Sequence, residues 1–411
     1  MLLILAGVTI SLLLDENGII KKSKDARREY GTSKTNEQEQ MDNANDWIEE
    51  ATAEPTPKVN VNTKAGENST INGKKGNSNN PTIPAGYIPI NTETSNWGNG
   101  KDAPSQDSVK HGLVIKDEKN NEWVWVPVPD VTVMCDTSNT TEYTLCGTTG
   151  DTAVTTNKYS KSGIISGKTR ITPGTTSDFR EPDLVVGSDG SSYDAKDTNY
   201  KTILGETGTK EQLAQLFVDE YKEMIESVSK YGGFYIGRYE LSEAGVQKDK
   251  TTLTSTNWYN LYNACINSNL QASNKVKTQM IWGCQWDITM NWLISSGAKT
   301  SDEVNKDSSS WGNYNNTLVK ADDGTTEIKA SGKDQQLNTG KTTFTMANNI
   351  YDLAGNVYEW TQEAFITDLR ASRGGSCFVD GSNYPASSRG GGDPVYSGYV
   401  IRFSSYFNNK I

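Results

Sequence analysis

The sequence has a single histidine, His111, and this scarcity excludes several kinds of catalytic site. Zinc sites built on several imidazoles need more histidines than the chain contains, and a serine or cysteine nucleophile with a histidine base would have to use His111. The five cysteines include no pair at the Cys-x-x-Cys spacing typical of structural zinc. The sequence therefore offers no conventional zinc centre.

An excess of positive charge is also missing. The chain has 40 lysines and arginines against 51 aspartates and glutamates, a net charge of -11. Nucleic-acid binding needs a clustered cationic surface to neutralise phosphates, so we expect no nucleic-acid partner. With 34% hydrophobic and 22% charged residues in 411, the composition favours a loop-rich core domain with appended segments.

The apolar run at residues 1–14 is shorter than the roughly 20 residues of a membrane-spanning helix. A charged, helix-favouring run follows it, to about residue 53. Leu3-Ile-Leu-Ala-Gly-Val-Thr-Ile-Ser11 and Glu16-Asn-Gly-Ile-Ile-Lys21 resemble the inner half of the N-terminal helix of type IV pilin-like proteins. Residues 1–53 are therefore interpreted as an anchor and pilin-like helix, with a secretory signal as the alternative. Both interpretations place the rest of the chain outside the membrane, and the first makes it a membrane-anchored cell-surface protein.

Residues 54–82 are rich in Pro, Asn, Gly, Thr and Lys without apolar periodicity, which predicts a flexible linker. The folded domain is expected at 83–407. A capping box, Thr209 with Gln212, opens the clearest helical pattern. Expected strands cover residues 112–115, 122–128 and 231–240, expected helices cover 209–231 and 258–268, and 280–293 begins as a strand and continues as a helix. This mixed order with long loops predicts an α+β fold.

Three short motifs near the C-terminus are the most specific part of the sequence. They are Tyr351-Asp-Leu-Ala-Gly-Asn-Val-Tyr-Glu-Trp360, Arg373-Gly-Gly-Ser376 and Ile401-Arg-Phe403. Together they resemble the core signature of the formylglycine-generating enzyme (sulfatase-modifying factor) family, and the aromatic run at 231–240 resembles an early strand of that family. The resemblance implies an elaborated C-type-lectin fold, and it makes oxygen-dependent formylglycine generation a candidate activity.

The residues that follow the Gly-Gly-Ser motif differ from those of the enzymes. The family's catalysis depends on a cysteine pair there that binds copper, because thiolates are soft ligands suited to Cu(I). This chain has only Cys377 in that segment. We therefore expect no catalytic residue and no required cofactor, and the sulfatase-modifying oxidoreductase is the alternative.

Two structural sites follow from other residues. In the family the Gly-Asn-x-x-Glu turn ligates calcium, which implies a structural Ca²⁺ at Asn356, Val357 and Glu359; the alternative is hydrogen bonding without metal. Cys135 and Cys146 flank a polar loop, where they would either form a disulfide or remain free thiols.

Five residue types are absent from residues 371–409: Lys, Glu, Gln, Met and Trp. They make up 84 of the 411 residues, so their absence from a stretch of this length is unexpected. They are also the residues that cannot be reached from an asparagine codon by changing its two leading adenines. This composition resembles the variable region of proteins diversified by a diversity-generating retroelement, which mutates adenines in lectin-fold binding proteins. The alternative is a Gly/Ser-rich terminal loop of skewed composition.

This interpretation predicts a ligand-binding segment of the receptor or adhesin type within residues 371–409. A surface of Tyr, Ser, Asn, Asp and Gly suits such binding, as it does in antibodies. Its ligand would be a protein or glycan on another surface, and a minor pilin-like structural role is a further alternative. The sequence leaves the ligand and the oligomeric state open. The candidate contact positions are Cys377, Phe378, Val379, Asp380, Asn383, Tyr384, Ser388, Gly390, Gly391, Asp393, Tyr396 and Tyr399.

Overall fold

The protein is described by a computed structural model. The described residues are 69–70, 77–79, 81–90, 109–130, 142–144, 158–160, 182–185, 193–254, 256–266, 276–366, 368–397, 400–401 and 403–407. They belong to the second of the two units into which the chain divides, Pro57–Ile411. The predicted anchor at 1–53, Cys135, Cys146 and Tyr399 lie outside them. Among the described residues, no helix has the length and apolarity needed to cross a membrane.

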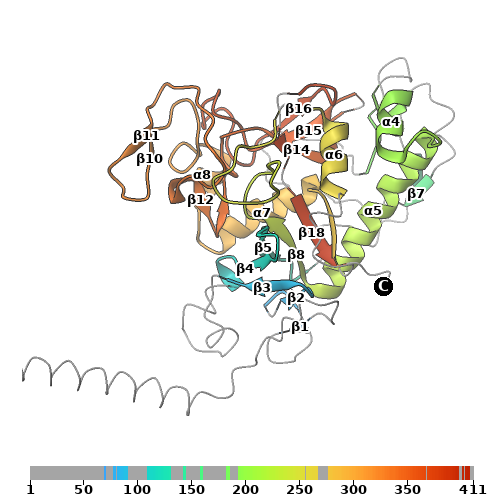
Figure 1. Ribbon diagram of the computed structural model, residues 1–411, viewed down its shortest axis with the longest axis horizontal. Coiled ribbons are helices and arrows are strands. Elements are labelled where there is room, and N and C mark those ends of the chain that lie inside the picture. Colours follow the sequence, from blue (N-terminus) through green and yellow to red (C-terminus); the bar gives the residue numbers. More distant parts are fainter. Residues whose placement is uncertain are drawn as a thin grey trace, which may run out of the picture. The chain divides into compact units, whose positions relative to one another are not determined.

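The larger sheet is antiparallel and has the strand order β3-β4-β5-β8-β18-β9 (Figure 1). Side chains Trp123 to Val126 of β5 are all buried, which places both faces of this strand in the core. The last strand, β18, pairs with both β8 and β9. The strands are β3 Tyr87–Pro89, β4 Val114–Asp117, β5 Glu122–Pro127, β8 Gly233–Gly237, β18 Phe403–Phe407 and β9 Val276–Met280.

The longest helix, α5 (Lys210–Tyr231), packs against this sheet, and its start is as predicted. Thr209 is the N-cap and forms the capping box with Gln212. The helix ends at Tyr231 and is capped by Gly232, whose φ of 80° is left-handed. A Cβ at Gly232 would lie 2.4 Å from the backbone nitrogen of Ser78, so glycine is required there for two reasons.

Four shorter helices complete the helical part of the described chain. The predicted helix near 258–268 is α6, and the predicted transition near 280–293 is β9 followed by α7. The sequence did not predict the two others, α4 and α8. Their bounds are α4 Asp197–Leu204, α6 Trp258–Ile266, α7 Gly283–Ser295 and α8 Ser301–Asn305.

A second sheet of four strands contains part of each C-terminal motif, in the order β16-β15-β14-β17. Strands β14, β15 and β16 are antiparallel, whereas β17 pairs with β14 in parallel. Figure 1 shows the first three beside α6. The strands are β14 Glu359–Ala364, β15 Arg370–Arg373, β16 Arg389–Gly392 and β17 Val400–Ile401.

Four small two-stranded sheets complete the strands. In one of them Ser69–Thr70 pairs with Thr82–Ile83, and the carbonyl of Ser78 accepts a hydrogen bond from the Trp125 indole at 3.0 Å. The folded part therefore includes described residues from within the range 54–82. The paired strands are β1 Ser69–Thr70 with β2 Thr82–Ile83, β6 Glu142–Thr144 with β7 Lys158–Ser160, β10 Val319–Lys320 with β11 Glu327–Lys329, and β12 Met346–Ala347 with β13 Ile350–Tyr351. Short 3-10 turns lie at η4 Tyr193–Ala195 and η6 Thr343–Thr345.

The architecture is mixed helix and sheet, which confirms the α+β prediction. Within the described residues the sheets are small and form no closed barrel. The core is rich in tryptophan, since large indoles bury much apolar area and need a polar partner at one edge only. The fully buried tryptophans are Trp123, Trp125, Trp258, Trp282, Trp286, Trp311 and Trp360.

Candidate functional site

The loop from 374 to 388 connects β15 to β16 and carries many of the predicted contact positions. Its backbone is held by main-chain hydrogen bonds to other parts of the chain. Cys377 N donates to the Asn356 carbonyl at 3.0 Å, and Asn315 N donates to the Val379 carbonyl at 3.0 Å. These bonds do not depend on the side chains of the loop. Part of what fixes its course is therefore independent of which side chains it displays.

Buried side chains anchor both ends of this loop. The Tyr314 hydroxyl donates to the Gly374 carbonyl at 2.9 Å, and the Trp286 indole donates to the Ala386 carbonyl at 3.0 Å. Gly375 has φ 74°, and a Cβ there would lie 2.5 Å from the Tyr384 carbonyl oxygen. The Gly-Gly of the motif therefore serves a backbone requirement of the loop.

Buried arginines on β15 form ion pairs with distant elements. Arg373 pairs with Asp287 of α7, and both side chains are fully buried. Arg370 pairs with Asp194 in the same way, and its guanidinium lies 4.2 Å from the ring centre of Trp258. Buried charges of this kind require a close partner, since an unpaired charge in the core is very costly. The pairs join β15 to α7 and to the segment before α4.

A third ion pair lies within the second sheet. Arg389 of β16 pairs with Glu363 of β14 at 2.9 Å, and its guanidinium lies 4.6 Å from the ring centre of Phe365. Both partners are almost fully buried. The start of β16 is therefore fixed to β14 across the intervening strand β15.

The structure divides the predicted contact positions by exposure. Tyr399 lies outside the described residues, and Cys377 is buried. The exposed positions are Phe378, Asn383, Tyr384, Gly391 and Tyr396, and the half-buried positions are Val379, Asp380, Ser388, Gly390 and Asp393. Sequence reasoning missed three exposed neighbours, Ser382, Val395 and Ser397, although their residue types fit the same codon rule.

Large apolar side chains are exposed unusually often in this segment. Of the eight such side chains among the described residues, four lie between Phe378 and Tyr396. Phe378 is 65% exposed and Tyr396 is 58% exposed. Exposed apolar groups collected in one segment are typical of binding surfaces. The four are Phe378, Tyr384, Val395 and Tyr396.

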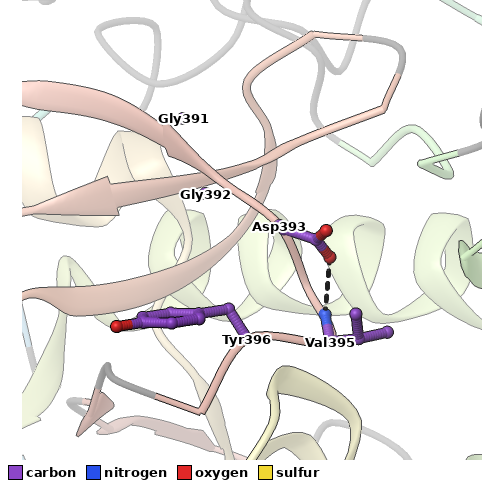
Figure 2. A pocket seen from close by; sticks show the side chains of 5 residues that line it. All are labelled: Gly391, Gly392, Asp393, Val395 and Tyr396. Atoms are coloured by element: carbon purple, nitrogen blue, oxygen red, sulfur yellow. Dashed lines mark hydrogen bonds between the residues drawn. The ribbon is translucent and has the colours of Figure 1, made fainter.

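The end of β16 and the chain after it form an open hollow of about 470 Å³. It is lined by Gly391, Gly392, Asp393, Val395 and Tyr396. Figure 2 shows the Asp393 carboxylate at the turn that follows the two glycines, and the Val395 and Tyr396 side chains beyond it, pointing in opposite directions. The segment is anchored from outside, since Trp258 N donates to the Pro394 carbonyl at 3.0 Å.

Cys377 lies at the position nearest to the enzymes' catalytic cysteines, but its environment does not favour a thiolate. Burial, with an added contribution from the Glu240 carboxylate, raises the pKa of its thiol to about 12. The thiol is therefore neutral at physiological pH, whereas copper ligation and nucleophilic attack both need the thiolate. The other cysteines of the described chain, Cys265 and Cys284, are also buried, and none of the three forms a disulfide.

The side chain of Asn356 already makes hydrogen bonds with both ends of its amide. Its Oδ1 accepts from Asn313 Nδ2 and from Leu337 N, each at 2.9 Å. Its Nδ2 donates to Glu240 Oε2 at 2.7 Å. A calcium ion ligated by this oxygen would have to displace one of the two donors.

The other two predicted calcium ligands are buried beside it. Val357 is 4% exposed and Glu359 is fully buried, with Glu359 Oε2 lying 2.8 Å from where a Cβ on Gly374 would be. The described chain contains no group of three or more His, Cys, Asp or Glu side chains placed to hold a metal ion. Calcium binding at Asn356, Val357 and Glu359 stays a prediction.

Comparison with known proteins assigns the chain to no family. No family model matches the chain. No curated protein matches it either. Among solved structures it is weakly similar to Treponema denticola variable protein 1, with 17% sequence identity and a TM-score of 0.20. That match covers 32% of this chain and 48% of the other, and so spans about half of that protein. At this TM-score the similarity supports no conclusion about fold or function.

Proposed function

We propose that the chain is a ligand-binding protein of the receptor or adhesin type. Its binding surface would be formed by the exposed residues Phe378, Ser382, Asn383, Tyr384, Gly391, Val395, Tyr396 and Ser397. The observation that carries this proposal is the collection of exposed Phe, Val and Tyr side chains in a segment with a fixed backbone. A pre-ordered surface binds with less loss of conformational entropy.

The composition of this surface supports the same role. Tyrosine gives a large contact area with few rotatable bonds, and serine, asparagine and glycine give adaptable hydrogen bonding. We infer that the domain has a C-type-lectin-like fold and that residues 371–409 are a variable region, with a protein or glycan ligand. Display at a cell surface through residues 1–53 belongs to the same proposal. The neutral, buried thiol of Cys377 makes the sulfatase-modifying alternative less favoured.

The variable-region part of the proposal is tested by sequencing. Codons for residues 371–409 would be read in many individuals of one lineage, together with the flanking DNA. We expect substitutions at positions such as Phe378, Asn383, Tyr384 and Tyr396, with a near-identical template and a reverse transcriptase gene nearby. The buried Arg373 should stay constant. A uniform segment without a template would contradict this part.

Binding itself is tested with a glycan array and an array of extracellular protein domains. Hits would be measured again with Phe378→Ala, Tyr384→Ala and Tyr396→Ala. Loss of one central aromatic anchor should weaken binding by about tenfold or more. Ile88→Ala is the matched control, because Ile88 is also 43% exposed but lies on β3. Equal losses in Ile88→Ala and in all three surface variants would contradict the proposed surface.

The enzyme alternative is tested separately. The copper-treated protein would be incubated under oxygen with a cysteine-containing sulfatase peptide, and aldehyde formation measured by mass spectrometry. We expect no product above background, because Cys377 is neutral and enclosed. Turnover that disappears in Cys377→Ala would favour the oxidoreductase.

A further inference from the structure

The hollow after β16 has one charged group in its lining, the carboxylate of Asp393. That carboxylate is held in position by two donors. Val395 N donates to its Oδ1 at 3.0 Å, and the Tyr193 hydroxyl donates to its Oδ2 at 3.0 Å. Each oxygen keeps acceptor capacity beyond these single bonds. A negatively charged acceptor is therefore fixed at the edge of an open space.

The surroundings of this carboxylate are negative. The charged groups that act on the Tyr193 hydroxyl are Asp393 and Asp368, and both add to the effect of burial in raising its pKa. The arginines of the neighbouring strands are already paired, Arg370 with Asp194 and Arg389 with Glu363. The lining of the hollow contains no lysine or arginine. An anion would therefore be repelled here, whereas a cation would be attracted.

The remaining lining suits a long, flat cation. The Tyr396 ring and the Asp393 carboxylate both line the hollow, to which Gly391 and Gly392 contribute no side chain of their own (Figure 2). An aromatic face attracts a guanidinium or ammonium group, and an aliphatic stem can lie against Val395. The Tyr396 side chain is more than half exposed, so part of its surface faces solvent.

We propose that this hollow is a subsite for a basic side chain, arginine above all, of a protein ligand. The inference rests on the proposed ligand-binding function and assigns its partner a positively charged contact residue. The guanidinium would pair with Asp393 and stack on Tyr396, with its stem beside Val395. A planar, five-donor group suits this combination of carboxylate and ring better than a compact ammonium.

The test uses small probes on the full chain. Amide chemical shifts of the isotope-labelled protein would be followed during titration with N-acetyl-arginine methylamide. The matched neutral probe is the citrulline analogue, in which a urea replaces the guanidinium. We expect the arginine probe to shift the amides of Gly391, Gly392 and Val395, and the citrulline probe to leave them unchanged. Added salt should weaken the arginine effect, because exposed charges are screened.

Two variants locate the effect. Asp393→Asn keeps the shape of the side chain and should weaken the binding of the arginine probe about fivefold. This is the upper end of the effect of an exposed ion pair. Tyr396→Phe keeps the ring and should retain binding, whereas Tyr396→Ala should reduce it. Asp380→Asn is the control, since Asp380 is a half-buried carboxylate of the loop at 374–388. If Asp393→Asn does not fold, the proposal is still tested by the salt dependence and by the comparison of Tyr396→Phe with Tyr396→Ala.

Three results would overturn the proposal. They are equal shifts with the citrulline probe, unchanged affinity in Asp393→Asn, and shifts produced by neutral methyl glycosides but not by arginine. The last result would identify a sugar subsite instead. This subsite can fail its test while the proposed binding function still stands. If arginine does not bind here but Phe378→Ala and Tyr384→Ala still abolish ligand capture, the binding surface stands without this subsite.

Discussion

Glu220 is a buried carboxyl group on α5 whose charge is poorly compensated. It accepts a hydrogen bond from the Tyr262 hydroxyl at 2.7 Å, and the nearest Lys277 Nζ is 4.0 Å away. Burial raises its pKa from the ordinary 4.5 to about 7, against the opposing effect of Lys277. The folded protein therefore holds this proton more tightly than the unfolded chain does.

This shift predicts a pH-dependent stability. The contribution of Glu220 to the stability of the folded protein is fully present below about pH 4.5, falls as the pH rises toward 7, and is lost above that. The difference between the ordinary pKa and that in the folded protein corresponds to about 3 kcal/mol in the free energy of unfolding. Glu220→Gln should remove this part of the slope and be more stable than the wild type at pH 8, as measured by urea unfolding at several pH values. Glu226→Gln, on the exposed face of the same helix, should keep the wild-type slope; a slope unchanged in Glu220→Gln would refute the assignment.

The strand β15 depends on its buried arginines, and Arg373 is the clearest case. Replacing it by methionine would remove the ion-pair partner of the fully buried Asp287 of α7. We expect Arg373→Met to lower the free energy of unfolding by about 3 to 5 kcal/mol, and a double variant with Asp287→Leu to recover most of it. Urea unfolding measures both.

A surface pair provides the control for this experiment. Asp302 of α8 and Lys306, the residue that follows this helix, also form an ion pair, but both side chains are more than 70% exposed. Lys306→Met should change the free energy of unfolding little, since solvent screens exposed pairs. A loss in Lys306→Met as large as in Arg373→Met would show that burial is not what makes the latter pair important.

Elements with a strong local pattern could be predicted from the sequence. The capping box at Thr209 and the apolar stripe after it define α5 without any tertiary information. The alternating residues of β5 and the glycine turn before β8 are similarly local. By contrast, α8 lies in a polar stretch, and its single buried residue, Val304, gives no periodic signal.

The candidate site was predictable only in part, for a related reason. The absence of five residue types pointed to residues 371–409, and most of the exposed positions found there had been named. The partners that hold the segment could not be found, because they are distant in sequence: Arg370 and Asp194 are 176 residues apart. Burial of Cys377, one of the predicted contacts, is likewise set by packing against the Asn356 turn.

At the scale of the whole molecule, the C-terminal strand completes the larger sheet. Ser404 of β18 pairs with Ile236 on one side and with Gln279 on the other. A chain that ends after Ser397 would leave both β8 and β9 with unpaired edges, which favours aggregation. We expect that truncation to be insoluble on expression, whereas a chain that ends after Phe407 should be soluble and should unfold at the wild-type temperature. A soluble, cooperatively unfolding chain ending at Ser397 would disprove this role of β18.

The main-chain hydrogen bonds of the loop at 374–388 also bear on how this protein can evolve. Because Asn356 and Asn315 bind the loop through its backbone, exchanging an exposed side chain such as Phe378 or Asn383 removes none of these supports. Mutations there change what the loop can contact at little cost in folding. Many residue types are therefore tolerated at these positions, and few at Gly375. Under the proposed binding function, this tolerance would let new ligand specificities arise while the fold stays intact.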